Sequence, residues 1–185
     1  MKLFDTHTHH LRHDAWVNRA PGDILEPGYT YSVGVHPWDA GSFDLRALEE
    51  AARHDCVKAI GETGLDTLRG PSLDIQESVF REHVRLSEMF GKPLIIHCVK
   101  AFDRLMALKK EIKPMQPWII HGFRGKPQQA GQLLRAGFHL SLGPNFNPET
   151  ARVIPSDRLH IETDDSPVAL EEVASAVQKA LDHRQ

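Results

Sequence analysis

Short apolar runs alternate with amphipathic segments along this chain. Each run is rich in β-branched or aromatic residues and stops at glycine, proline or polar residues, which is typical of buried strands. Strands are predicted at Lys2–His7, Ala15–Arg19, Thr30–His36, Val57–Glu62, Pro93–Cys98, Pro117–Gly122, Phe138–Gly143 and Leu159–Thr163. Strands that alternate with helices indicate βα units and a parallel sheet.

The segments between the later strands have helical periodicity. Ser42 is a good N-cap for the first of them, and Gly91 can end the second in the left-handed conformation. Helices are predicted at Phe43–His54, Leu73–Phe90, Ala101–Ile112, Pro127–Ala136 and Val168–Leu181.

The first third of the chain leaves little room for helices. Only about a dozen residues separate the first strands, and residues 14–28 contain two prolines and two glycines. A full barrel of eight βα units usually needs about 250 residues, with ~200 near the lower limit. The chain has 185. We therefore expect one domain over residues 1–185: an α/β, TIM-like (β/α) barrel, shortened, with its first one or two crossover helices missing.

Charge and composition narrow the function. Lys plus Arg number 22 and Asp plus Glu number 25, a net charge of -3, so no global positive field attracts nucleic acid. A local basic stretch runs from Lys100 to Lys113, which is typical of a solvated helix face. The chain has no long apolar run and a polar first segment, and Cys56 and Cys98 lack metal-site spacing. We expect a cytoplasmic protein with free thiols and no membrane contact.

Histidine is unusually frequent, with 12 residues. His54, His83 and His183 lie in amphipathic stretches, and we expect them at or near the surface. Other histidines come directly after apolar runs and need another explanation.

Six ligand-type side chains lie at the carboxyl ends of predicted strands. His7 and His9 are two apart in a strand and therefore share a face. Any one of these residues fits a polar side chain leaving a strand for a loop. In a parallel barrel, however, all such ends meet on one face, where active sites lie. The set suits Zn²⁺, Mn²⁺, Fe²⁺ or Mg²⁺, and its other members are Glu62, His97, His121 and Asp164.

The motifs that carry these residues resemble those of TatD-family metal-dependent hydrolases, which belong to the amidohydrolase-type barrel superfamily. In order they are D-T-H-T-H, G-V-H-P, G-E-T-G-L-D, I-I-H-C, I-H-G-F-R-G and E-T-D-D-S-P, and they span residues 4–167. The resemblance implies a two-metal site in a TIM-like barrel. It implies that His7, His9 and Asp164 bind one ion, that His97 and His121 bind the other, and that Glu62 bridges both.

The resemblance also implies a reaction. Family members are commonly magnesium- or manganese-assisted DNases, so we expect hydrolysis of DNA or a small phosphodiester with two divalent ions (Mg, Mn or Zn). Asp164 is the candidate general base, and Glu62 acts electrostatically. His36 either contacts phosphate and the leaving group or is structural.

Three further residues are candidates for substrate contact or for support of the ligands. Asp66 is expected to orient a ligand histidine, and the alternative is a loop aspartate. Arg124 is expected to bind phosphate, and the alternative is a surface arginine. Lys100 is a candidate because family members often carry arginine where this chain has Val99. Besides these three, Trp38 is a candidate for base stacking, with core or rim packing as the alternative, whereas packing is expected for Trp16.

Departures from the family pattern keep other functions open. Thr67-Leu68 replaces an aromatic pair, and the family's Arg-Asn-Glu-Pro element is missing after Pro167. One alternative is a hydrolase of another ester or amide bond, such as a D-aminoacyl-tRNA deacylase. A second alternative is a non-catalytic metal-binding protein. No protein partner is predicted.

Overall fold

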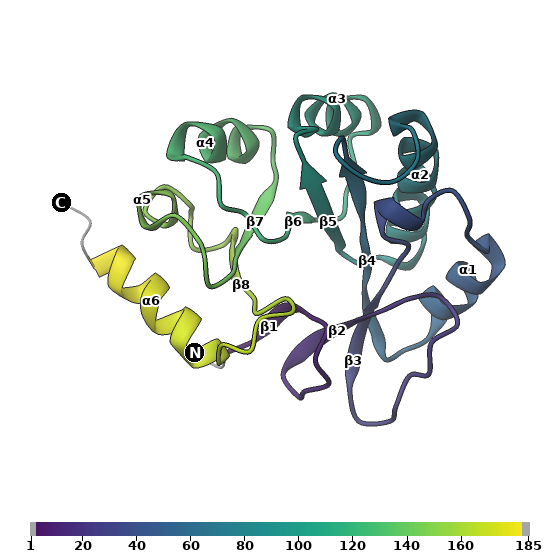
Figure 1. The fold of residues 1–185 in the computed structure, drawn as a ribbon, viewed down its shortest axis with the longest axis horizontal. Helices are drawn as coiled ribbons and strands as arrows, with labels where there is room; N and C mark the ends of the chain where they lie inside the picture. The colour runs from purple at the N-terminus through teal and green to yellow at the C-terminus, as the bar shows by residue number, and fades with distance from the viewer. Residues whose placement is uncertain (1–2, 183–185) are drawn as a thin grey trace.

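The computed structural model describes residues 3–182 and contains a single eight-stranded parallel sheet (Figure 1). The strands pair in chain order, each with the next. They are β1 (Asp5–Thr8), β2 (Ala15–Arg19), β3 (Thr30–Val33), β4 (Val57–Asp66), β5 (Leu94–Val99), β6 (Trp118–Ile120), β7 (His139–Leu142) and β8 (Leu159–Ile161). The described residues also form six α-helices and one 3-10 helix, of which all but the last lie between strands: η1 (Pro37–Asp39), α1 (Leu45–Arg53), α2 (Leu73–Phe90), α3 (Phe102–Ile112), α4 (Pro127–Arg135), α5 (Pro148–Ala151) and α6 (Leu170–Asp182).

The sheet closes on itself between its first and last strands. A parallel bridge joins Thr8 to Asp164. The amide of His9 donates to the carbonyl of Asp164 at 3.1 Å, and the amide of Asp164 donates to the carbonyl of His7 at 2.9 Å. The predicted barrel is therefore confirmed, with a short closing seam.

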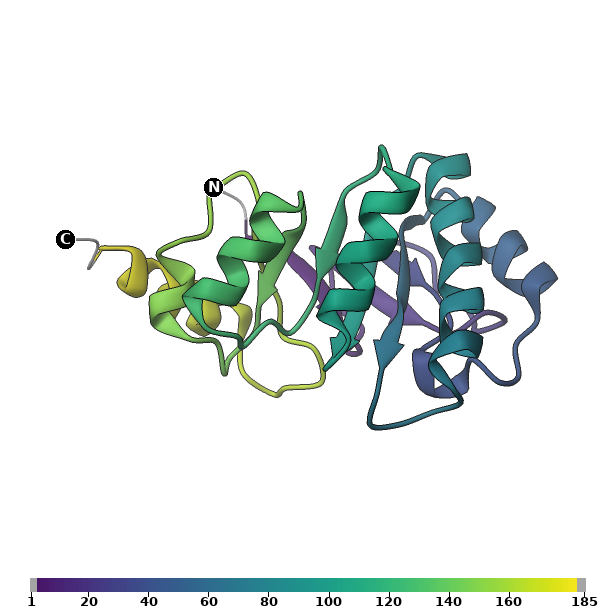
Figure 2. The same cartoon turned by 90° about the horizontal axis from the view of Figure 1, so that it is seen from above.

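The first two crossovers contain no helix, as the sequence predicts. Residues 9–14 connect β1 to β2, and residues 20–29 connect β2 to β3. The second connection packs Leu25 and Tyr29 against the core, and the carbonyl of Glu26 accepts a hydrogen bond from the Tyr31 hydroxyl at 3.0 Å. Helices α2, α3 and α4 lie side by side on the opposite flank (Figure 2). The connections next to β1 and β2 are therefore loops.

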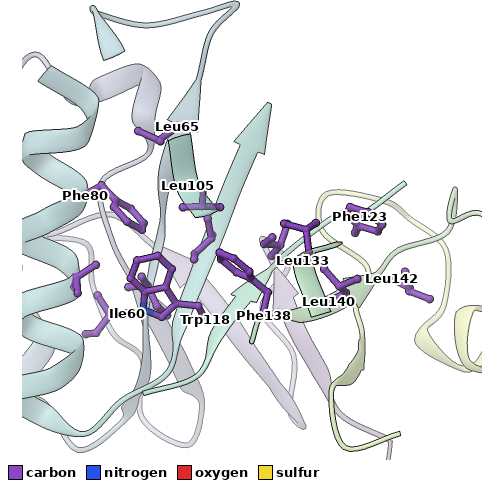
Figure 3. Close-up of a cluster of buried hydrophobic side chains, with 14 of the residues drawn as sticks. Ile60, Leu65, Phe80, Leu105, Trp118, Phe123, Leu133, Phe138, Leu140 and Leu142 are labelled. Atoms are coloured by element: carbon purple, nitrogen blue, oxygen red, sulfur yellow. The ribbon is translucent and has the colours of Figure 1, made fainter. Parts of the chain in front are cut away.

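Two apolar layers hold the barrel together. Inside it, Trp16 packs on a small cluster of Ala59, Ile95 and Ile119, so the expected packing role of Trp16 is confirmed. Between the sheet and the helices, Phe80 meets Trp118 edge to face, with ring centroids 5.1 Å apart. Figure 3 shows this outer layer, which also contains Leu105 of α3 and Phe138 before β7.

Most predicted elements are present with shifted ends. The strand Ala15–Arg19 and the helix Leu73–Phe90 have the predicted bounds. Strand β4 runs past Glu62 to Asp66, because its pairing with β5 continues as far as Asp66 and Val99. The first helix is capped by Asp44, whose side chain accepts from the amides of Arg46 and Ala47, and not by Ser42. The short helices η1 and α5 were not predicted.

The surface prediction for His83 is wrong. Its side chain is fully buried. Its Nε2 accepts from the amide of Val35 at 2.9 Å, and its Nδ1 donates to the carbonyl of Val79 at 2.8 Å. His54 is exposed as expected, whereas His183 and the predicted strand start at Lys2 lie outside the described residues.

In the described part of the chain, no helix is long and apolar enough to cross a membrane.

Candidate metal centre

A cavity of about 780 Å³ opens at the carboxyl ends of the strands. This is the face on which barrel enzymes carry their sites. The predicted residues that line it are His9, His36, Glu62, His97, His121 and Asp164. Its wall also includes Asn18, Arg19, Ala20, Pro21, Asp23, Gly34, Val35, Trp38, Asp39, Ser42, Phe43, Asp44 and Asp165.

Glu62 lies at the centre of the cluster and is almost completely buried. The backbone directly after β3 packs closely against the backbone next to Glu62. A Cβ on Gly34 would lie 2.5 Å from the Cα of Gly61, so only glycine fits at position 34. The two carboxylate oxygens of Glu62 face different imidazoles. Oε1 lies 2.8 Å from His121 Nε2, 3.0 Å from His97 Nδ1 and 3.3 Å from His36 Nε2. Oε2 lies 3.4 Å from His7 Nε2 and 3.8 Å from His9 Nε2.

Asp164 joins the β1 histidines from across the barrel seam. Its Oδ1 is 3.5 Å from the Nε2 atoms of both His7 and His9. Its backbone has a φ of 56°, which is uncommon for a non-glycine residue. Hydrogen bonds on both sides hold this conformation, since its amide donates to His7 and its carbonyl accepts from His9 and from the Thr8 hydroxyl. The closing seam therefore also positions the carboxylate.

The donor atoms form three overlapping groups, each with its ligand atoms within 4.8 Å of one another. Two of them share His7, which is paired with His9 and Glu62 in one group and with His121 and Asp164 in the other. The third consists of His36, Glu62 and His97. Imidazole and carboxylate donors at this spacing suit divalent cations.

His7 gives a direct test of whether the residues fit a cation. Both of its ring nitrogens are buried, and neither has a hydrogen-bond partner within the described residues, although Nε2 faces two carboxylates. A buried polar atom without a partner costs roughly 1–3 kcal/mol. A cation bound between His7, Glu62 and Asp164 would remove that cost for Nε2, so the donor set fits a metal ion.

The electrostatics of the cluster lead to the same conclusion. Burial favours the neutral form of Glu62, but the charge and hydrogen bond of His121, the hydrogen bond of His36 and the nearby His7 imidazole hold its pKa well below the usual value. Burial also lowers the pKa of His7, as does the charge of His121, but the Asp164 and Glu62 carboxylates outweigh both and raise this pKa to about 9. The carboxylates of the site therefore stay ionised and favour a positive charge beside them. A divalent cation would supply that charge in place of the protons on the histidines.

Supporting residues fix the orientation of two histidines. Asp66, predicted for this purpose, lies with Oδ2 3.1 Å from His97 Nε2 and accepts from Trp38 Nε1 at 2.7 Å. Glu162, which was not predicted, is fully buried, and its Oε1 lies 3.3 Å from His121 Nδ1 and accepts from the Gly122 amide at 2.6 Å. A signal for Glu162 exists in the motif E-T-D-D, where it precedes the candidate ligand by two residues.

Asn18 is a second residue that was not predicted. Its Oδ1 accepts from the backbone amide of Glu62 at 2.9 Å and from the hydroxyl of Ser32 at 3.3 Å. No sequence signal marks Asn18, because an asparagine within a short strand is uninformative until the partner strands are placed.

Three predicted substrate residues lie in places that their sequence positions did not indicate. Lys100 and Arg124 are exposed and do not line the cavity. Lys100 instead borders a separate pocket of about 360 Å³ beside α3. His36, for which the sequence left a phosphate contact and a structural role open, lies within 3.3 Å of both Glu62 Oε1 and His97 Nδ1, and so directly beside the candidate ligands.

Comparison with known proteins adds independent evidence. A family described as TatD related DNase matches residues 6–180. The metal-dependent hydrolase YabD of Bacillus subtilis is 35% identical over 161 residues, which cover 80% of this chain and 63% of YabD. The 3'-5' ssDNA/RNA exonuclease TatD of Cronobacter sakazakii is 34% identical over 155 residues, covering 72% and 56%. This chain therefore spans little more than half the length of the curated relatives that it matches.

Solved structures show the same fold. The TatD homologue YjjV of Escherichia coli superposes with a TM-score of 0.71 at 20% identity and covers 90% of this chain and 83% of its own. A TatD-family hydrolase of Entamoeba histolytica superposes with a TM-score of 0.62 at 28% identity, covering 72% and 50%. Both likenesses extend the agreement from sequence motifs to the arrangement of the strands.

Proposed function

The chain belongs to the TatD-related DNase family, and on that premise we propose that it is a metal-dependent hydrolase of phosphodiester bonds. One observation carries the proposal. The buried Glu62 carboxylate directs one oxygen to His7 and His9, at the end of β1, and the other to His97 of β5 and to His121 after β6. A shared carboxylate between two sets of imidazoles is an arrangement that can hold two neighbouring divalent cations.

The ligands divide between the two oxygens of Glu62. Oε2, with His7, His9 and Asp164, would hold one ion. Oε1, with His97 and His121, would hold the other, with His36 beside it. Magnesium, manganese or zinc in these positions would act as a Lewis acid on the phosphoryl oxygens and acidify a water for attack.

Asp164 is the group that this chain offers as general base. Its side chain is 30% exposed and lines the cavity, whereas the Glu62 side chain is only 5% exposed. Burial raises the pKa of Asp164, but the adjacent His7 imidazole and the charge of His121 outweigh burial and lower this pKa, so the carboxylate is ionised at neutral pH. An ionised carboxylate facing the cavity can accept the proton that the attacking water loses.

His36 is the second group on the cavity wall that can act on a phosphodiester. Its side chain is 20% exposed and lines the cavity, and Nδ1 accepts from the Trp38 amide at 3.2 Å. That bond leaves Nε2 directed at the ligand cluster, 3.3 Å from Glu62 Oε1. His36 can therefore donate a hydrogen bond to a phosphate oxygen or a proton to the leaving group.

The test is cleavage of single- and double-stranded DNA and of small phosphodiesters with Mg²⁺, Mn²⁺ or Zn²⁺. We expect Glu62→Gln and His97→Ala to lose about 10²-fold or more in kcat/KM, the scale of removing a group used in proton transfer or charge stabilisation. The matched control is Glu172→Gln on the exposed face of α6. Carboxylic esters and amides, including a D-aminoacyl ester, belong in the same panel. Turnover of those alone would contradict the proposal, as would full activity in both variants.

A further inference from the structure

Trp38 stands at the edge of the metal centre without being part of it. Helix η1 begins directly after His36, and this places the indole ring centroid 4.4 Å from that of His36 and 6.0 Å from that of His97. The side chain is nevertheless 40% exposed and lines the cavity. A large aromatic surface thus faces the space next to the reacting group.

The indole is held firmly although it is exposed. Its Nε1 donates to Asp66 Oδ2 at 2.7 Å, and the guanidinium carbon of Arg69 lies 3.9 Å from the ring centroid. Phe43, also partly exposed, lines the same cavity. A fixed, half-exposed aromatic ring can bind a planar ring without a further cost in side-chain ordering.

The charges on the cavity wall limit which substrates can enter the cavity. Beyond the candidate ligands, the wall carries the carboxylates of Asp23, Asp39, Asp44 and Asp165. Arg19 is the one lysine or arginine among the described residues that line the cavity, and its guanidinium donates to the carbonyls of Asn18 and His9.

A continuous strand brings one negative charge with every phosphate, and proteins that bind such strands present a basic groove to them. In this protein the cavity wall beyond the candidate ligands is acidic instead. The wall therefore repels every phosphate of a strand except the one that the metal ions would neutralise.

We propose that the cavity takes a short nucleotide phosphodiester, with the scissile phosphate at the metal centre and its base stacked on Trp38. The acidic wall then selects against the interior of a long strand. This inference rests on the proposed phosphodiesterase function and specifies its substrate class.

The first experiment isolates the base. The 4-nitrophenyl phosphate esters of thymidine (5′-linked) and of methanol share a leaving group and differ in the nucleoside. We expect the wild type with Mn²⁺ to favour the thymidine ester by about 5- to 100-fold in kcat/KM, the scale of one base–aromatic stack. Trp38→Leu should bring this ratio close to 1, chiefly through KM, and Trp38→Phe should largely restore it.

The phenylalanine variant separates stacking from support of His97. It keeps the ring but loses the hydrogen bond to Asp66. A ratio that falls equally in both variants, or does not change in either, overturns the role of Trp38. If neither ester is hydrolysed with any metal and the oligonucleotides are also resistant, the proposed function itself fails. Hydrolysis of both esters with equal kcat/KM overturns only this inference.

The second experiment isolates the charge. We expect a dinucleotide to be cleaved with a higher kcat/KM than internal bonds of a single strand of about 20 nucleotides at low salt. Asp39→Asn combined with Asp165→Asn should narrow the difference between these kcat/KM values, because it removes two negative charges from the wall. Neither side chain takes part in the hydrogen bonds described for the wall, so the local fold should be kept. A wild type that cleaves internal bonds of the long strand as well as it cleaves the dinucleotide would contradict the selection for length.

Discussion

Glu162 holds His121 from beneath the cavity. It is fully buried, contacts His121 Nδ1 through Oε1, and leaves the opposite ring nitrogen directed at Glu62. A carboxylate on the far side of a ligand histidine fixes the orientation of the ring and makes its other nitrogen a better metal ligand. Glu162 is therefore a positioning residue for the proposed metal centre.

Removing the charge of Glu162 should weaken metal binding. For Glu162→Gln we expect affinity for Mn²⁺ or Zn²⁺ to fall about 10-fold or more, as measured by calorimetric titration. Circular dichroism shows whether the variant is folded, and Glu172→Gln on α6 is the control. Unchanged affinity in a folded variant would mean that Glu162 serves the barrel and not the metal centre.

Asp66 plays the corresponding part for His97, and the sequence did point to it. Its position directly after the G-L segment of β4 placed it near the active face. The contact with Trp38 could not be foreseen, because η1 has no periodic signal and lies 28 residues away from Asp66. Residue types were readable from the sequence, whereas their pairings were not.

At the scale of elements, α2 links the outer layer to the site. It packs Phe80 against Trp118. Through His83 it also accepts a hydrogen bond from the amide of Val35, the residue before His36. The helix thus holds the segment that carries His36 in place.

This link should make stability depend on pH. Burial lowers the pKa of His83 from 6.5 to about 4, against a smaller opposing effect of the Val79 carbonyl. A lowered folded-state pKa means that the stabilisation is complete above pH 6.5 and is lost as pH falls toward 4, since the unfolded chain binds the proton first. The expected loss is about 2 to 3 kcal/mol.

Urea unfolding of wild type and His83→Gln across this pH range tests the effect. Glutamine keeps a donor and an acceptor but does not titrate, so the variant should lose less stability on acidification. His160, whose pKa burial also lowers to about 4, is present in both proteins and cancels in the comparison. Parallel pH profiles would show that His83 is not the group responsible.

For the whole molecule, the proposed metal centre ties distant parts of the barrel together. Its ligands come from β1 and the residue after it, from β4 and β5, and from the segments after β6 and β8. The β1–β8 seam is short, and Asp5 reinforces it by accepting from the hydroxyl and the amide of Thr163 at 2.6 and 3.1 Å. A cation shared among these elements should stabilise the closed barrel.

Metal addition should therefore raise the melting temperature. At a concentration of about 100 times Kd, a ligand that binds only the folded state adds about 2.7 kcal/mol, or about 5 to 10 °C for a chain of this size. Thermal melts of EDTA-treated protein with and without Mn²⁺ measure this shift, and Glu62→Gln should reduce it strongly. A melting temperature that no divalent ion changes would contradict the proposed metal centre.

Local pattern was sufficient for much of this protein. Apolar periodicity predicted the order of the strands and the bounds of α2, and the short spacings predicted that one or two of the first crossover helices are missing. The parallel arrangement then placed six ligand-type residues on one face. These features follow from neighbours along the chain and from the geometry common to parallel barrels.

Other features depended on the folded chain. The two-sided environment of Glu62, the contacts of Asn18 and Glu162, the approach of His36 to His97 and the exclusion of Lys100 and Arg124 from the cavity all appear only in three dimensions. Each depends on distances of a few ångströms between residues far apart in sequence, as in the contact of Asp5 with Thr163 across 158 positions. Hydrophobic patterning selects elements and faces, but it does not specify such distances, because they are set by the packing of every strand and loop between the two residues.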